Sequence, residues 1–416
     1  MNQPAAAGAG RTPGVVGSAD VRRGAAVLAR LVGDVEAFLR DHWARAPLLR
    51  SVDDPGLVRG LLTIADVDTL LAQRSPRLPM VRVVRDGSAV PAVRFTTTAR
   101  IGSTQVGDLI DPGLIAAEFA AGSTISLQGL QRYWQPLTEF CQSLEAVLTH
   151  PFQANAYLSP PAATGLSVHH DTHDVFVLQV EGSKHFDVYE PVTWLPVSGQ
   201  HWTSKDPPAD PVISVDLKPG DCLYMPRGWR HRAFTTDSHS LHLTIGLLGY
   251  TWLGLESVLA ADLRQQPAFR EPLPAGFAND PDALTAAVAE RLTALRSWLD
   301  GADPAAIAES LTRRFVRARP APPAGIAAAV TAVTIAADTP VRRTPFARCL
   351  LRQSPHGVDL VLADRVVTFP LLAATVVRAV VTRESFTAAD LPGALDLPGR
   401  LVVVRRLVAE GLLVAG

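Results

Sequence analysis

The sequence predicts an α+β fold in which helices flank a double-sheet jelly-roll barrel, followed by a helical region and a C-terminal winged helix. Three observations lead to it. Short strand patterns separated by turn residues fill positions 152–249, helical patterns dominate 253–318, and strands return among helices near the end of the chain. Short strands at this density are typical of a jelly roll whose mouth holds a small ligand.

Length and composition limit the class of protein that this chain can be. The chain has 416 residues, 47% of them hydrophobic and 19% charged, which is typical of a globular protein with more than one domain. The formal net charge of −1 gives no reason to expect a nucleic-acid or membrane partner. Three cysteines, odd in number and without CxxC spacing, fit a reducing cytoplasm. The start lacks the pattern of a secretory signal, so we expect a cytoplasmic protein.

Residues 1–20 are rich in Ala, Gly and Pro and are predicted to be disordered. Before the barrel, helical spacing follows Val32, with Val35, Phe38, Leu39 and Trp43 on one stripe that Pro47 ends. Further elements there are expected at 61–73 (helix), 78–87 (strand) and 124–150 (a longer helix). Barrel strands are predicted within 152–160, 174–180, 184–191, 212–228 and 240–249.

After the barrel, helices are predicted over 253–267, 281–301 and 304–318, and RPAPPAG interrupts them near residue 320. Their apolar stripes are broad enough to need burial, and we therefore expect a homodimer through this region. The stripe of the second helix contains Leu284, Val288, Leu292, Leu295 and Trp298.

The end of the chain has the element order of a winged helix. A hairpin is expected over 358–370, helices over 371–381, 386–393 and 397–411, and a last strand over 412–416. The domain prediction is thus a disordered segment 1–20, a catalytic domain 21–252, a helical dimerisation region 253–338 and a winged helix 339–416.

The stretch LSVHHDTHDVFVLQVEGSKHF, Leu166 to Phe186, places histidines and aspartates ahead of an apolar strand. If that strand extends back through HHDTH, His169 and Asp171 share one face. The third ligand should be a distant histidine, and His231 follows a Pro-Arg-Gly turn. Two histidines and a carboxylate on one face of an ion are diagnostic of non-haem Fe(II) oxygenases.

Three neighbouring side chains, His170, His173 and Asp174, are left outside this predicted triad. His170 has the wrong parity, and the other two exceed what a facial triad needs.

An iron of this kind usually works with 2-oxoglutarate, whose far carboxylate needs a cation. Lys184 follows the turn Glu181–Gly182 and is the candidate; a solvated turn lysine is the alternative. Asn155 and Tyr157 share one face of a preceding strand and could bind the same carboxylate.

Two residues of the strand SLHLTIGLL, His242 and Thr244, share one face. They line a substrate pocket if that face is inward, or they merely pack in the barrel.

The stretch NAYLSPPAATGLSVHHDTHDVFVLQVEGSKHFDVYEP is similar to the core of the Jumonji-C ribosomal oxygenases, also called the cupin-4 family. FLRDHWARAPLLR, LQGLQRYWQP, LKPGDCLYMPRGWRHRA and SHSLHLTIGL agree with it. The resemblance covers nearly the whole chain, including the dimerisation region and the winged helix.

The resemblance implies an oxygenase that uses Fe(II), 2-oxoglutarate and O2 to hydroxylate histidine or arginine in a ribosomal protein. The family's metal triad falls on His169, Asp171 and His231, and its 2-oxoglutarate-binding residues fall on Lys184, Asn155 and Tyr157. Lysine at position 184 resembles the eukaryotic-type members more than the bacterial arginine hydroxylases, which leaves the target residue open.

Three other readings remain. The chain could hydroxylate another protein or peptide, or be a cupin without oxidative chemistry, such as an isomerase. It could also be a winged-helix DNA-binding regulator with a metal-sensing cupin. From residue 383 onward, Arg383, Arg400, Arg405 and Arg406 are balanced by Glu384, Asp390, Asp396 and Glu410, whereas a DNA reader normally has a basic footprint.

Overall fold

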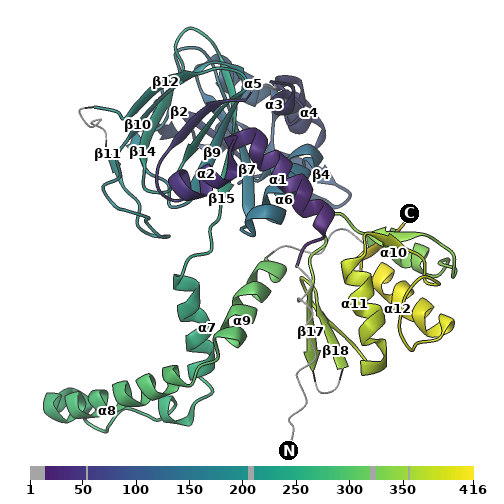
Figure 1. Cartoon of the computed structure of the whole chain (residues 1–416). Helices are drawn as coiled ribbons and strands as arrows, with labels where there is room; N and C mark the ends of the chain where they lie inside the picture. Colours follow the sequence, from purple (N-terminus) through teal and green to yellow (C-terminus); the bar gives the residue numbers. More distant parts are fainter. Residues whose placement is uncertain (1–14, 53–54, 205–209, 319–324, 355–356) are drawn as a thin grey trace, which may run out of the picture. The chain divides into compact units, whose positions relative to one another are not determined.

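The computed structural model describes residues 15–52, 55–204, 210–318, 325–354 and 357–416 (Figure 1). The chain divides into two compact units, one of residues 19–249 and one of residues 250–416 with the segment before residue 19. Among the described residues, no helix combines the length and the apolar run needed to span a bilayer.

Two antiparallel sheets form the first unit. The larger has the strand order β1-β13-β9-β15-β7-β6-β2-β3 and the smaller β11-β8-β14-β10-β12. The strands of the larger sheet are β1 (Leu48–Ser51), β2 (Val81–Arg85), β3 (Ser88–Ala89), β6 (Thr124–Leu127), β7 (Phe152–Ser159), β9 (Asp174–Gly182), β13 (Asp221–Met225) and β15 (Ser240–Leu247). Those of the smaller sheet are β8 (Val168–His169), β10 (Lys184–Tyr189), β11 (Thr203–Ser204), β12 (Ile213–Leu217) and β14 (Arg230–Phe234).

Strand β9 lies between two apolar cores, and both of its faces are buried. Val175 and Val177 pack with Phe186 of β10 in the core between the sheets. Phe176 and Leu178 point the other way, into the core under the helices. The residues of both faces in 175–178 are therefore apolar, and the predicted cupin-type barrel is confirmed.

Helices cover the outer face of the larger sheet (Figure 1). They are α1 (Ser18–Val32), α2 (Val35–Ala37), α3 (Pro55–Arg59), α4 (Ile64–Gln73), α5 (Pro112–Ala120) and α6 (Gln135–Leu148). A hairpin of β4 (Thr96–Ile101) and β5 (Thr104–Ile110) lies among them.

In the second unit, helices α7 (Leu253–Leu263), α8 (Pro281–Asp300) and α9 (Pro304–Arg317) come first. The C-terminal part has its own apolar core and two three-stranded sheets, β20-β16-β21 and β17-β18-β19. Its elements are α10 (Gly325–Ala332), β16 (Val341–Arg343), β17 (Leu350–Ser354), β18 (Gly357–Val361), β19 (Val366–Phe369), α11 (Ala374–Thr382), β20 (Ser385–Phe386), α12 (Leu397–Ala409) and β21 (Leu413–Ala415).

Several predicted elements are wrong in detail. Residues 15–20 are ordered rather than disordered: α1 begins at Ser18, and the carbonyl of Val15 accepts a 3.0 Å hydrogen bond from the amide of Cys349. Residues 1–14 lie outside the described residues, as does most of RPAPPAG. The helix expected after Val32 is a short α-helical turn and the π-helical turn Phe38–His42, which leaves Leu39 exposed.

Two further helix predictions differ from the structure. The first is wrong only at its start, since α6 spans Gln135–Leu148 of the expected helix. The first four residues of the helix expected over 124–150 form β6, which is buried at every position between β2 and β7. The helix expected over 386–393 is absent; β20 and a turn are found there, and Thr387 bonds to Asp390 through its amide and hydroxyl.

Candidate metal centre and pocket

The structure brings His169, Asp171 and His231 together. Each offers one ligand atom, and these atoms all lie within 4.8 Å of one another. Nε2 of His231 is 3.9 Å from a carboxylate oxygen of Asp171, and the two imidazole ring centres are 4.4 Å apart. Two imidazoles and one carboxylate at this spacing fit a divalent first-row metal ion.

Backbone carbonyls fix the orientation of both imidazoles. Nδ1 of His169 is 2.8 Å from the carbonyl of Ser167, and Nδ1 of His231 is 3.2 Å from the carbonyl of Trp229. Each ring therefore donates its Nδ1 proton to the backbone and keeps the Nε2 lone pair free for a metal.

Strand pairing, rather than one continuous strand, brings the ligands together. The predicted extension of β9 back through HHDTH is wrong: His169 ends β8 in the smaller sheet, and β9 begins at Asp174 in the larger one. His169 and His231 face each other directly across β8 and β14. Asp171 lies in the crossing between the two sheets, and its carbonyl accepts a 3.0 Å hydrogen bond from the amide of Gly228.

The protonation states of His231 and Asp171 suit metal binding at neutral pH. Burial, together with the nearby His169, lowers the pKa of His231 to about 4. Burial acts to raise the pKa of Asp171, but the surrounding histidines, His231 foremost, outweigh it and lower that pKa. A neutral imidazole beside an ionised carboxylate is the form that binds a divalent ion.

The three side chains left out of the triad have other roles. His170 is buried, and its Nε2 donates to the carbonyl of Gln200 at 2.8 Å. Asp174 accepts from the hydroxyl of Tyr224 at 2.7 Å and from the amide of Arg227 at 3.1 Å, which holds the turn before β14. His173 lies against Gly246, where an added Cβ would come within 2.8 Å of its ring.

Lys184 is buried, not a solvated turn lysine. Gly182 (φ +64°) makes the turn into β10, and the Nζ of Lys184 donates to Oγ of Ser159 at 3.0 Å. Ser159 is also 2.9 Å from the hydroxyl of Thr124. Burial lowers the pKa of Lys184 to about 8, so the side chain remains a cation at neutral pH.

Of the other residues predicted to belong to the site, three line the cavity and one does not. Tyr157 and His242 stack with ring centres 5.0 Å apart, and both line the pocket, as does Thr244. Asn155 does not line it; its Oδ1 accepts from the amide of Gly129 at 2.9 Å. Burial raises the pKa of the Tyr157 phenol and holds that of His242 well below its usual value, so the phenol is protonated and the imidazole neutral.

The metal-site residues and Lys184 line the same cavity as Tyr157, His242 and Thr244. It has a volume of about 270 Å³ and lies between the two sheets. The remaining walls come from residues that the sequence did not predict to be part of a site, among them Arg82, Thr124, Ser126 and Gln128. The alternation of residues along β2 could have indicated Arg82 as a pocket residue. Val81 and Val83 are buried in the core under the helices, so Arg82 between them points to the opposite face, toward the barrel interior.

Known proteins that are similar to this chain agree with the cupin-type barrel described above. Residues 128–254 match the JmjC domain. "Ribosomal oxygenase 1" of Gallus gallus is 34% identical over 263 residues, which are 61% of this chain and 42% of that protein. "Bifunctional lysine-specific demethylase and histidyl-hydroxylase NO66" of Drosophila persimilis is 32% identical over 225 residues, 53% of this chain and 31% of that protein. The match therefore spans less than half the length of these relatives.

Solved structures resemble the chain over almost its whole length. YcfD of E. coli has a TM-score of 0.53 at 17% identity, covering 93% of this chain and 99% of its own. A YcfD structure described as a ribosomal oxygenase in complex with cobalt and 2-oxoglutarate has a TM-score of 0.51 at 17% identity, covering 92% and 98%. This likeness establishes the fold. Residues 128–254 thus match the JmjC domain family, and the predicted resemblance to the Jumonji-C ribosomal oxygenases is confirmed by the similarity to ribosomal oxygenase 1.

Proposed function

We propose that this chain is an Fe(II)- and 2-oxoglutarate-dependent oxygenase that hydroxylates a residue of a protein, and that the protein is ribosomal. One observation carries the proposal: the His169–Asp171–His231 cluster and the buried cation of Lys184 line the same cavity. The names of the relatives, a ribosomal oxygenase and a histidyl-hydroxylase among them, support the substrate class.

Each side chain has a role in this proposal. His169, Asp171 and His231 hold the metal, and the carboxylate offsets part of its charge. Lys184 receives the far carboxylate of 2-oxoglutarate, and the protonated phenol of Tyr157 donates to the same group. Asn155 acts indirectly, by holding the backbone at Gly129. The bound metal and cosubstrate supply the oxidation, in which O2 and 2-oxoglutarate become succinate, CO2 and the oxygen added to a substrate C–H bond.

Succinate formation tests the activity. Purified protein with Fe(II), 2-oxoglutarate and O2 is expected to release succinate, and a ribosomal protein of its own host is expected to gain about 16 Da, one oxygen atom. Succinate without any ribosomal product, together with a shift in another protein, would leave the oxygenase standing and replace the substrate. Metal binding without oxygen-dependent succinate would favour a non-oxidative cupin or a metal-sensing regulator.

The domain assignment also belongs to this proposal. We assign 21–252 to catalysis, 253–338 to dimerisation and 339–416 to a winged helix. The change of compact unit between Gly249 and Tyr250 supports the first boundary. The C-terminal core with its helices and small sheets supports the last. The cysteine pattern supports the proposal of a cytoplasmic location.

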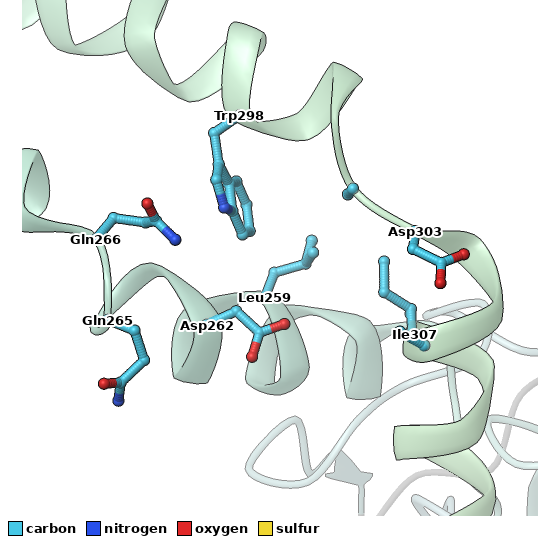
Figure 2. A pocket seen from close by; sticks show the side chains of 9 residues that line it. Leu259, Asp262, Gln265, Gln266, Trp298, Asp303 and Ile307 are labelled. Carbon is cyan, nitrogen blue, oxygen red and sulfur yellow. The ribbon is translucent and has the colours of Figure 1, made fainter. Parts of the chain in front are cut away.

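Homodimerisation is supported by helices α7 and α8, none of whose residues is buried within the chain. Val288 and Leu292 are each 47% exposed and lie on one face of α8. A groove of about 260 Å³ opens between α7, α8 and α9, with Trp298 and Leu259 facing it (Figure 2). Exposed apolar stripes of this kind are usually covered by a partner, here a second copy.

A charged side chain on this stripe is expected to break the dimer. Wild-type protein should have twice the mass of the chain by light scattering at micromolar concentration, and Leu292→Glu should be a monomer, because a carboxylate would be buried without a partner. Glu290→Ala, on the opposite face of α8, is the control and should stay dimeric. A monomeric wild type would refute the dimer.

A further inference from the structure

We propose that Arg82 determines the specificity of this pocket: it selects a substrate side chain that offers a hydrogen-bond acceptor without a positive charge, and it rejects lysine and arginine. This inference rests on the proposed oxygenase function and narrows its substrate class.

The position of Arg82 follows from the register of the larger sheet. Arg82 pairs with Ser126, Ser126 with Tyr157, and Tyr157 with His242. All four residues line the cavity, so they form one row across β2, β6, β7 and β15 on the pocket wall. Burial raises the pKa of Tyr157 and the positive charge of Arg82 acts against that rise, which puts the guanidinium within electrostatic reach of the phenol. Arg82 itself is exposed and therefore lies at the open side of the cavity.

The charge of Arg82 is not neutralised. Farther along β2, Arg85 forms a 2.6 Å ion pair with Glu118, which also pairs with Arg94 at 2.8 Å. Arg82, by contrast, makes neither an ion pair nor a side-chain hydrogen bond to any residue that the structure describes. Arg82 lies at the open side of the cavity, so water satisfies its donors while no substrate is bound, and an entering side chain would replace that water.

The charged residues of the cavity wall are Arg82, Lys184 and Asp171. In the proposed function Asp171 binds the metal and Lys184 the cosubstrate, so Arg82 is the charged group left to meet the substrate. A lysine or arginine target would meet a like charge there, and the carboxylate of the described wall, Asp171, is committed to the metal in the proposed function. An imidazole, amide or carboxylate can instead accept from the guanidinium, which has five donors.

Binding of two peptide libraries tests the proposal without turnover. Both libraries have randomised flanks; the central residue is histidine or asparagine in one and arginine or lysine in the other. Immobilised protein with Mn(II) and 2-oxoglutarate is expected to retain the first library about tenfold better than the second, the equivalent of about 1.4 kcal/mol. Arg82→Met should remove the preference, Arg82→Glu should reverse it, and Arg82→Lys should keep the rejection of cations.

Arg74→Met is the matched control, because Arg74 is an exposed arginine outside the cavity, and it should behave as wild type. Reversal by Arg82→Glu is the decisive readout, since a merely structural role would not invert a charge preference. Equal retention of the two libraries by the wild type, or a preference that Arg82→Glu leaves unchanged, overturns the inference. Succinate formation without peptide is measured in parallel: its absence would refute the oxygenase, whereas its presence beside charge-independent retention refutes only the role of Arg82.

Discussion

Replacing Asp171 with alanine is expected to abolish stoichiometric metal binding and all succinate formation. Asp171 is the only carboxylate within 4.8 Å of both imidazole donors among the described residues, and it is ionised at neutral pH. Two neutral imidazoles without it carry no charge to offset a dication. Loss of an outer partner of a metal ligand typically costs 10- to 100-fold in affinity, so loss of this ligand should cost at least about 100-fold. Metal content after anaerobic loading with Fe(II), measured by elemental analysis, checks this.

Asp216→Ala provides the matched control. Asp216 is also a carboxylate beside a histidine, 2.8 Å from Nδ1 of His185, but its side chain is 58% exposed and it is not part of the cavity wall. This variant should keep its metal and its activity. A full metal content in Asp171→Ala would show that the proposed triad does not form the site.

The barrel strands could be predicted from the sequence because their local patterns are strong. The four residues after Asp174 are all apolar, and turn residues separate the strands around them. Strand β6 was mistaken for the start of a helix because it is only four residues long and a helix, α6, follows a few residues later. Only its place between two other strands, which local sequence does not encode, makes it a strand.

The site shows the same division between local and long-range information. His169 and Asp171 were predicted on the assumption of one strand, yet the chain changes sheets between them and Asp174. They still meet, because the motif is short and His231 pairs directly with His169. Arg82 was missed because its neighbourhood depends on β2 pairing with β6 and β6 with β7, contacts between segments far apart in the chain.

Replacing Lys184 with methionine is expected to weaken 2-oxoglutarate binding at least about 30-fold while the metal stays bound. Removing one member of a buried charge pair costs on the order of 2 kcal/mol or more, and the rest of the cavity would be unchanged. The same variant should be more stable than wild type without cosubstrate. Burial lowers the pKa of Lys184 from 10.5 to about 8. Below pH 8 the buried lysine is charged, and this charge lowers the free energy of unfolding by about 3 kcal/mol or less. Calorimetric titration and thermal unfolding of the metal-loaded protein measure the two effects.

Wild-type protein should also lose 2-oxoglutarate affinity as the pH rises through about 8, because the free Lys184 then gives up its proton. Lys184→Arg is the control: a guanidinium stays charged, so its affinity should not fall over that range, even where its larger head group weakens binding at every pH. A merely structural lysine would move stability and cosubstrate affinity in the same direction when replaced by methionine. An increase in stability with a loss of 2-oxoglutarate affinity in the methionine variant, and no loss of affinity above pH 8 in the arginine variant, would assign the carboxylate of 2-oxoglutarate to Lys184. Equal affinity of the wild type and the methionine variant would exclude that assignment.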